Sequence, residues 1–305
     1  MPLHLTPMNR RAFLSRTAAT LAGISVMRVG MAAPMADSCS LALLSDTHIA
    51  ADPDLIARQM NMTANLKQVV GEVGRLSTRP QAVIVNGDCA FQHGVPADYA
   101  QFVKCLQPLI DADHSIHMTM GNHDERGAFF EVLKDQQAAQ PPVESKHISI
   151  LETPFANLFL LDTMKQVNVV TGELGEAQRA WLAQALDSRT EKPAVVVAHH
   201  TLQTDPPPEG KPAGGILDTA EFLKILHARP HVRGYVFGHS HRWSCKEEDG
   251  LHLVNLPAIA YSFAPTALLG WTLARLNREG MEFQICALDQ SHPQHQETYR
   301  FNWKR

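Results

Sequence analysis

The amino-acid sequence predicts an α/β fold with a largely parallel sheet, and three observations carry this prediction. From residue 41 onward, short apolar runs alternate with amphipathic stretches, and a repeated order of strand and helix is typical of parallel sheets. The composition, with 45% hydrophobic and 19% charged residues, is that of a globular protein. A chain of 305 residues also buries enough surface to fold without a disulfide or metal staple. We therefore expect any bound metal to serve function.

The predicted strands are short apolar runs bounded by turn residues, which is typical of strands buried on both faces. They are residues 41–44, 82–85, 116–120, 158–161, 194–197 and 235–237. The predicted helices lie between them and show apolar residues at three-and-four spacing. They are residues 56–76, 97–110, 127–136, 176–186 and 219–227. In the C-terminal third, residues 251–255, 270–276 and 281–288 resemble consecutive strands, so we expect a second sheet there.

Charge and cysteine content exclude several classes of protein. The formal net charge of −4 argues against a nucleic-acid or anionic-membrane binder, because such proteins need a basic excess. The five cysteines are widely spaced and never form a C-x-x-C pair, so they indicate neither a disulfide framework nor a zinc ribbon. At least one thiol is free, and whether any pair is oxidised stays open. The unusual feature is the content of 16 histidines.

Residues 1–33 are predicted to be a signal peptide, followed by one folded domain over residues 34–305. An arginine pair at 10–11 precedes a mildly apolar stretch and small residues at 30–33, and the apolar run is too short to span a bilayer. Arg-Arg-x-Phe-Leu resembles the twin-arginine signal. This resemblance implies export to the periplasm or the extracellular space, with no stable membrane anchor afterwards. An amphipathic or disordered tail is the alternative.

Polar side chains follow five of the predicted strands in succession. The segments are Asp46-Thr47-His48, Asn86-Gly87-Asp88, Gly121-Asn122-His123-Asp124, Ala198-His199-His200 and Gly238-His239-Ser240-His241. Because ligands of an open α/β sheet bind beyond the carboxyl ends of the strands, we expect these loops to converge on one crevice. In Asp-x-His and His-x-His, the two side chains lie on the same side of an extended segment. This geometry suits two ligands of one metal ion.

Seven of these side chains supply carboxylate, imidazole or amide donors, with no thiolate. They are Asp46, His48, Asp88, Asn122, His199, His239 and His241. This donor mix suits Fe, Mn, Zn, Ni or Co. Seven donors exceed the three or four that one catalytic zinc takes, so we expect two metal ions that share a bridging carboxylate. Each motif alone is a weak signal for metal binding. Histidines with a purely structural role, however, do not explain five such motifs in succession, each directly after an apolar run.

The order Asp-x-His, Gly-Asp, Gly-Asn-His-Asp, His and Gly-His-x-His resembles the calcineurin-like metallophosphoesterase superfamily over residues 46–241. The resemblance implies a four-layer α/β/β/α sandwich with two mixed sheets and a dinuclear metal site. For the first metal it implies Asp46, His48, Asp88 and His241, and for the second Asp88, Asn122, His199 and His239, with Asp88 as the bridge. It also implies that His123 is a catalytic histidine that binds no metal and is oriented by Asp124.

This resemblance implies hydrolysis of phosphate esters by a metal-bridging hydroxide, with His123 assisting the leaving group. Residues 94–99, 121–126, 172–182 and 238–242 further resemble the class III cyclic-nucleotide phosphodiesterase branch. Phe91 stands where purple acid phosphatases have a tyrosine ligand, which contradicts an iron(III)-tyrosinate site. Thr201 departs from the branch, which has proline there, and export separates the protein from the cytoplasmic cyclic-nucleotide pool. A phosphomonoester, a phosphodiester or a cyclic nucleotide therefore stays open as the small substrate.

A different class of function also stays open, namely an exported, non-catalytic metal-binding protein that retains the phosphoesterase fold. Among the other residues, Arg126 and Arg242 flank the motifs and are candidates for holding a phosphate oxygen. Tyr261, Phe263 and Trp271 are expected to pack in the core, which is the common role of an aromatic side chain.

Overall fold

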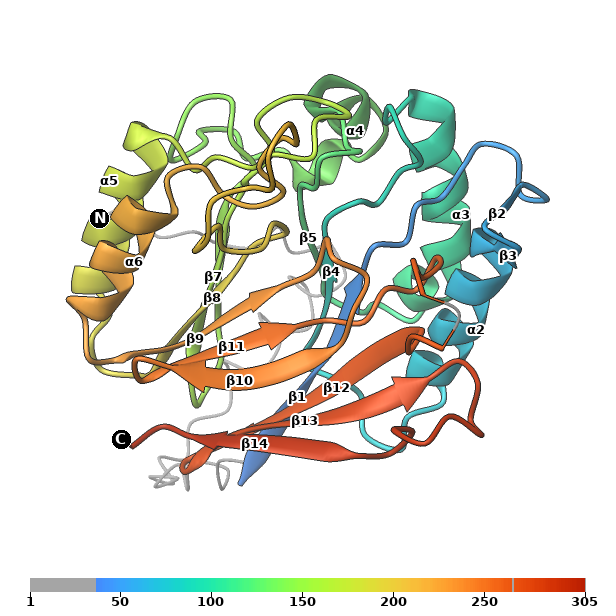
Figure 1. Cartoon of the computed structure of the whole chain (residues 1–305). Coiled ribbons are helices and arrows are strands. Elements are labelled where there is room, and N and C mark those ends of the chain that lie inside the picture. The colour runs from blue at the N-terminus through green and yellow to red at the C-terminus, as the bar shows by residue number, and fades with distance from the viewer. Residues whose placement is uncertain (1–36, 265, 305) are drawn as a thin grey trace, which may run out of the picture. The chain divides into compact units, whose positions relative to one another are not determined.

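The computed structural model describes residues 37–264 and 266–304. The predicted signal peptide, residues 1–33, lies outside the described residues. The described residues form two mixed six-stranded sheets flanked by helices, together with a two-stranded hairpin (Figure 1). No helix among them is both long enough and apolar enough to cross a membrane.

The first sheet has the strand order β14-β13-β12-β1-β4-β5. Its strands are β1 (Ser38–Ser45), β4 (Ala82–Asn86), β5 (Ile116–Thr119), β12 (Gly270–Asn277), β13 (Gly280–Ala287) and β14 (Thr298–Asn302). Strands β1, β4 and β5 run parallel, while β12, β13 and β14 continue the sheet antiparallel. The predicted strands 270–276 and 281–288 therefore extend this sheet and do not belong to the second one.

The second sheet has the strand order β10-β11-β9-β8-β7-β6. Its strands are β6 (Ser149–Glu152), β7 (Asn157–Leu160), β8 (Ala194–Val197), β9 (Val232–Phe237), β10 (Ser244–Glu248) and β11 (Leu251–Asn255). Strands β7, β8, β9 and β11 run parallel, and the edge strands β6 and β10 are antiparallel. Of the predicted C-terminal strands, only 251–255 joins this sheet.

Alternate side chains of the central strands face different layers. In β1, Ala42 and Leu44 belong to the cluster that packs against helices α2 (Met62–Gly74) and α3 (Pro96–Asp111), whereas Leu41 and Leu43 belong to the cluster between the two sheets. Helices α5 (Glu176–Asp187) and α6 (Thr219–His227) cover the outer face of the second sheet through Leu182 and other apolar residues. This period of two follows from the pleat of a strand. The predicted four-layer α/β/β/α sandwich is confirmed.

The helices agree with the predicted segments to within two residues, except at the start of the first, and at the end of the third, where α4 stops at Val132 and a separate 3₁₀ helix follows. They are α2 (Met62–Gly74), α3 (Pro96–Asp111), α4 (Arg126–Val132), the 3₁₀ helix η1 (Lys134–Gln136), α5 (Glu176–Asp187) and α6 (Thr219–His227). The predicted helix 56–76 is wrong over its first six residues, which form the hairpin β2 (Ile56–Ala57) and β3 (Met60–Asn61). The Asn61 side chain accepts a hydrogen bond of 2.7 Å from the Ala64 N–H. This N-cap starts α2 only after the hairpin.

Candidate metal centre

The five loops predicted to converge do so at the carboxyl ends of β1, β4, β5, β8 and β9. Backbone hydrogen bonds connect them, including His48 N–H to the Asp88 carbonyl at 2.9 Å and Gly238 N–H to the His199 carbonyl at 2.9 Å. Six of the seven predicted ligands are buried, and His239 is half-buried. The convergence follows from the parallel strand order, because the carboxyl ends of parallel strands meet at one edge of a sheet.

Six predicted ligands form two groups whose nitrogen and carboxylate oxygen atoms lie within 4.8 Å of one another, and His48 and Asp88 also form such a group with His123. The first group contains Asp46, His48 and His241, and the second contains Asp88, His199 and His239. Asp88 lies between the groups, since its Oδ2 is 3.6 Å from His48 Nε2 and 3.2 Å from His199 Nε2. A carboxylate in this position can contact two cations at once.

The backbone at these positions is strained. Asp46, His48, Asp88, His239 and His241 all have positive φ values, between 44° and 67°. Residues other than glycine rarely adopt this conformation, which costs of the order of 1 kcal/mol or more each and concentrates at functional sites. The strained backbone lowers the stability of the fold, but it directs five of the seven predicted ligands into one space.

Two glycines allow the loops to approach one another. Gly87 has a φ of 72°, and a Cβ atom there would lie 2.5 Å from His199 Nδ1. A Cβ atom on Gly121 would collide with the carboxylate of Asp88. Only glycine fits at these two positions, because any side chain would displace a predicted ligand.

Backbone carbonyls orient the imidazoles of the centre. The Asn86 carbonyl accepts from His199 Nδ1 at 2.9 Å, and the Tyr261 carbonyl accepts from His241 Nδ1 at 2.5 Å. A carbonyl can only accept, so each Nδ1 carries a hydrogen, and each Nε2 faces the carboxylates of the centre. His241 Nε2 then lies 3.3 Å from Asp46 Oδ1, and His48 Nε2 lies 3.1 Å from His241 Nε2.

The charge distribution also suits cations. Burial disfavours the ionised carboxylates, but the neighbouring imidazoles outweigh it and lower the pKa of Asp46 and of Asp88. Burial lowers the pKa of His48 to about 3 and that of His239 to about 4, so both are neutral donors at neutral pH. Burial opposes the charged form of His199, but Asp88 and Asp46 outweigh it and raise its pKa to about 10. A cation that takes this place releases the His199 proton.

Asn122 supplies the strongest sign that a group other than protein belongs here. Its side chain is 1% exposed, and its Oδ1 atom has no hydrogen-bond partner among the described residues. An unpaired buried carbonyl oxygen costs about 1–3 kcal/mol unless another group compensates it. The amide oxygen, four imidazoles and two carboxylates together fit the predicted pair of Fe-, Mn- or Zn-type ions.

His123 lies beside both groups, and its orientation differs from the prediction in one respect. Its ring centroid is 5.2 Å from that of His48, and its backbone N–H donates to Asp88 Oδ1 at 2.9 Å. Its Nδ1 donates to the Gln92 carbonyl at 2.8 Å. The Gln92 carbonyl, and not Asp124, therefore orients the ring, which leaves Nε2 available for proton transfer.

Asp124 organises the surrounding loops. Its carboxylate accepts hydrogen bonds from the N–H groups of Cys89, Ala90 and Gly121 and from the hydroxyl of Tyr99. Burial and the nearby Asp88 raise its pKa to about 6, although the three backbone donors oppose this rise. Asp124 thus fixes the segment that carries Asp88 relative to the segment that carries Asn122.

The suggested phosphate contact of Arg126 does not fit the structure. Its guanidinium donates to both carboxylate oxygens of Asp162 at 2.7 Å and to the Met164 carbonyl. The buried carboxylate requires this partner, because an unpaired buried charge is costly. Arg242 is exposed.

The three aromatic residues that were predicted to pack in the core differ in burial. Trp271 and Tyr261 are buried as predicted, at 2% and 8% exposure, but the core prediction for Phe263 is wrong, because its side chain is 55% exposed. Arg58, which was predicted to be helical, lies at the tip of the β2–β3 hairpin and over the rings of Tyr261 and Phe263. Arg58 and Phe263 lie outside the sequence motifs, so only the tertiary structure reveals that both lie close to the metal centre.

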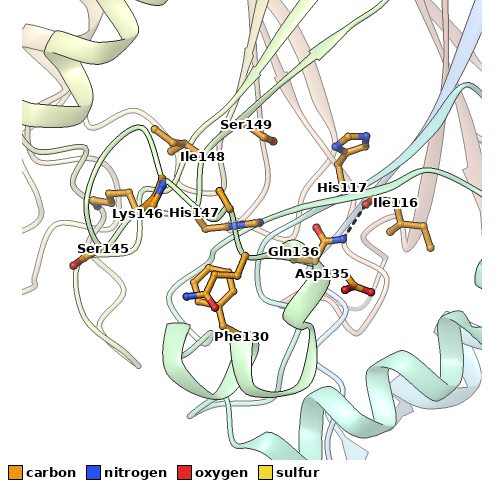
Figure 2. Close-up of a pocket in the computed structure, with 13 residues that line it drawn as sticks. Ile116, His117, Phe130, Asp135, Gln136, Ser145, Lys146, His147, Ile148 and Ser149 are labelled. Carbon is orange, nitrogen blue, oxygen red and sulfur yellow. Dashed lines mark hydrogen bonds between the residues drawn. The ribbon is translucent and has the colours of Figure 1, made fainter. Parts of the chain in front are cut away.

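A cavity of about 370 Å³ lies apart from the centre (Figure 2). We call it the β5–β6 cavity, because residues of β5, of β6 and of the segment between them line it, including His117, Lys146 and His147. It contains none of the nine predicted catalytic and ligand residues.

The fold and the centre together define the class of the protein, a metal-dependent phosphoric ester hydrolase. The family model described as calcineurin-like phosphoesterase matches residues 40–243, and the chain belongs to this family. The predicted superfamily and enzyme class are confirmed. The solved structure of a dimetal phosphatase from Danio rerio has the same fold, with a TM-score of 0.67 at 14% identity over 87% of this chain and 99% of that one.

Curated relatives include phosphodiesterases of more than one kind. A 3′,5′-cyclic adenosine monophosphate phosphodiesterase of Pseudomonas aeruginosa is 26% identical, over 78% of this chain and 82% of the relative. A glycerophosphodiester phosphodiesterase of Enterobacter lignolyticus is 25% identical, over 72% and 77%. A probable cyclic nucleotide phosphodiesterase of Rhodococcus erythropolis is 27% identical over 52% of this chain, and the match spans half of that relative's length.

Proposed function

We propose that the protein is an exported, dinuclear-metal phosphodiesterase for small phosphodiesters. The position of Asp88 carries this proposal, because its carboxylate lies 3.6 Å from His48 of the first group and 3.2 Å from His199 of the second. One carboxylate shared between two ligand groups is the arrangement that a two-metal hydrolase needs.

The residues present would hold two cations in the way that the sequence predicts. Asp46, His48, Asp88 and His241 would surround the first, and Asp88, Asn122, His199 and His239 the second. When bound, such a pair supplies Lewis-acid stabilisation of phosphate oxygens and lowers the pKa of water, so that hydroxide can attack in line. The identity of the metals depends on supply as well as on donor type.

The chain's own residues supply the remaining chemistry. The Gln92 carbonyl holds the Nδ1–H of His123, so Nε2 can deliver a proton to the departing oxygen of the ester. The side chain is half-buried, so substrate can reach it.

Relatives favour a diester over a monoester substrate, because the three curated relatives above are all named phosphodiesterases. A panel of substrates tests the proposal on the metal-loaded protein: p-nitrophenyl phosphate, its bis ester, 2′,3′- and 3′,5′-cyclic nucleotides, and glycerophosphodiesters. We expect faster turnover of diesters than of the monoester. Full metal loading without turnover of any compound would favour the non-catalytic metal-binding alternative.

Export through a twin-arginine signal over residues 1–33 belongs to the same proposal. It is supported by the arginine pair at positions 10–11 and by the weakly apolar stretch that follows. Replacing both arginines with lysines should retain the protein in the cytoplasm, as cell fractionation would show. Unchanged export of that variant would exclude the twin-arginine route.

A further inference from the structure

Three side chains form a rim immediately outside the first ligand group, and we call Arg58, Tyr261 and Phe263 the Arg58 rim. The Tyr261 ring stacks on the His48 ring at a centroid distance of 5.0 Å and lies 4.9 Å from the His241 ring. The Phe263 ring lies 4.6 Å from the His241 ring. The rim therefore touches two imidazoles of the metal centre.

The two aromatic members differ in exposure. Tyr261 is buried at 8% exposure, whereas Phe263 remains 55% exposed although it packs against His241. Single exposed apolar residues are ordinary on a protein surface. An exposed ring in contact with an imidazole of the metal centre, however, offers apolar surface where a bound ester would extend away from its phosphate.

Arg58 adds a cation to the rim. Its guanidinium lies 4.7 Å from the Phe263 centroid and 5.5 Å from the Tyr261 centroid. The turn that carries it is strained, with φ values of 48° at Arg58 and 65° at Gln59. No carboxylate forms an ion pair with Arg58 in the described part of the chain. In a chain of net negative charge, this guanidinium raises the local potential for an anion.

We propose that the Arg58 rim binds the aromatic base of a nucleotide while the metal centre holds its phosphate, an inference that rests on the proposed function. Nucleobases stack on aromatic rings and on arginine guanidinium planes, largely irrespective of base identity. A glycerol or aminoalcohol substituent has no such face. The rim therefore selects nucleotide phosphodiesters over glycerophosphodiesters.

The experiment compares 5′-AMP with glycerol 3-phosphate, which share a phosphomonoester and differ in the base. Calorimetry on the metal-loaded protein gives both dissociation constants without turnover. We expect Phe263→Leu and Arg58→Met each to weaken AMP binding about tenfold and to change glycerol 3-phosphate binding less than about twofold. Phe263→Trp should retain AMP binding, because it keeps the aromatic face. Ile110→Ala and Arg278→Met, which alter exposed residues outside the rim, are the matched controls.

Equal affinity of the wild type for both ligands, or equal loss of both in the variants, would overturn the rim as a base site. Metal content is measured in each variant, because Phe263 touches His241. If Phe263→Leu loses metal, Arg58→Met decides, since Arg58 contacts the two rim rings and none of the seven predicted ligands among the described contacts.

Failure of the proposed function has a different signature. If the metal-loaded wild type hydrolyses neither 3′,5′-cyclic AMP nor glycerophosphoethanolamine, the phosphodiesterase proposal is wrong. A preference for AMP that disappears only in the rim variants would still identify the base site in that case.

Discussion

The metal centre and the β5–β6 cavity both contain histidines and carboxylates, but they differ in how these groups are satisfied. In the cavity, Lys146 donates to the carbonyls of Asp162, Met164 and Glu173, and His117 Nε2 lies 3.0 Å from Ser115 Oγ. His147 packs against two phenylalanine rings. The centre instead leaves Asn122 Oδ1 unpaired and holds five residues at positive φ. The cavity lining has one residue other than glycine at positive φ, Ser145, so the two regions differ in how many strained residues they gather and not in histidine content.

The largest expected effect is at the carboxylate that the two ligand groups share. Asp88→Asn should remove bound metal and lower kcat/KM more than about 10,000-fold, because both cations lose a ligand. Metal analysis and diester hydrolysis measure this. The matched change in the cavity, Asp135→Asn, alters an exposed carboxyl and should leave both quantities unchanged. An Asp88→Asn protein that keeps two metal ions and normal turnover would contradict this difference between the metal centre and the cavity.

The next effect separates catalysis from metal binding within the centre. His123→Ala should lower kcat about 100- to 10,000-fold, the range of a lost general acid, while two metals stay bound. Leaving groups of low pKa, such as p-nitrophenol, should suffer least, because they depart without a proton. Loss of metal in this variant would make His123 a ligand and contradict its assigned role.

A structural effect is expected beside the cavity. Asp162→Ala leaves the Arg126 guanidinium without its buried partner, and we expect the free energy of unfolding to fall by about 3–5 kcal/mol. Urea denaturation measures it. Asp187→Ala breaks the exposed pair with Arg229 and should change stability far less. Equal losses in the two variants would show that the buried pair has no special importance.

The smallest effect is expected for a substitution in the β5–β6 cavity. His117→Gln should leave metal content and kcat/KM within about twofold of the wild type, as is usual for a substitution away from the site. A tenfold loss of either quantity would make the β5–β6 cavity part of the functional site.

Sequence patterns predicted the elements whose burial is one-sided or complete. The helix over residues 219–227 has the predicted bounds, and every apolar run became a strand. The edge strands β6, β10 and β14 were not predicted. Strand β10, with the sequence Ser-Cys-Lys-Glu-Glu, is mostly exposed and has no apolar run, so only its partner strand reveals it. The hairpin before α2 was also missed, because its apolar residues continue the helical spacing by coincidence.

The convergence of the predicted ligands was predictable because each is adjacent to a strand end and therefore local in sequence. Contacts between segments that are far apart in the sequence were not predictable. The Gln92 carbonyl that orients His123, the Asp162 carboxylate that engages Arg126 and the Arg58 rim all depend on how loops meet in space. Residue type and spacing carry no information about such meetings.

The proposed function requires two metal ions at the Asp88 carboxylate for the hydrolysis of phosphodiesters. Its most direct test is to titrate metal-free protein with Mn²⁺ while following the hydrolysis of bis(p-nitrophenyl) phosphate and the bound metal together. Turnover should rise with metal occupancy and saturate at two ions per chain. Full activity without metal, or two bound ions without any turnover, would contradict it.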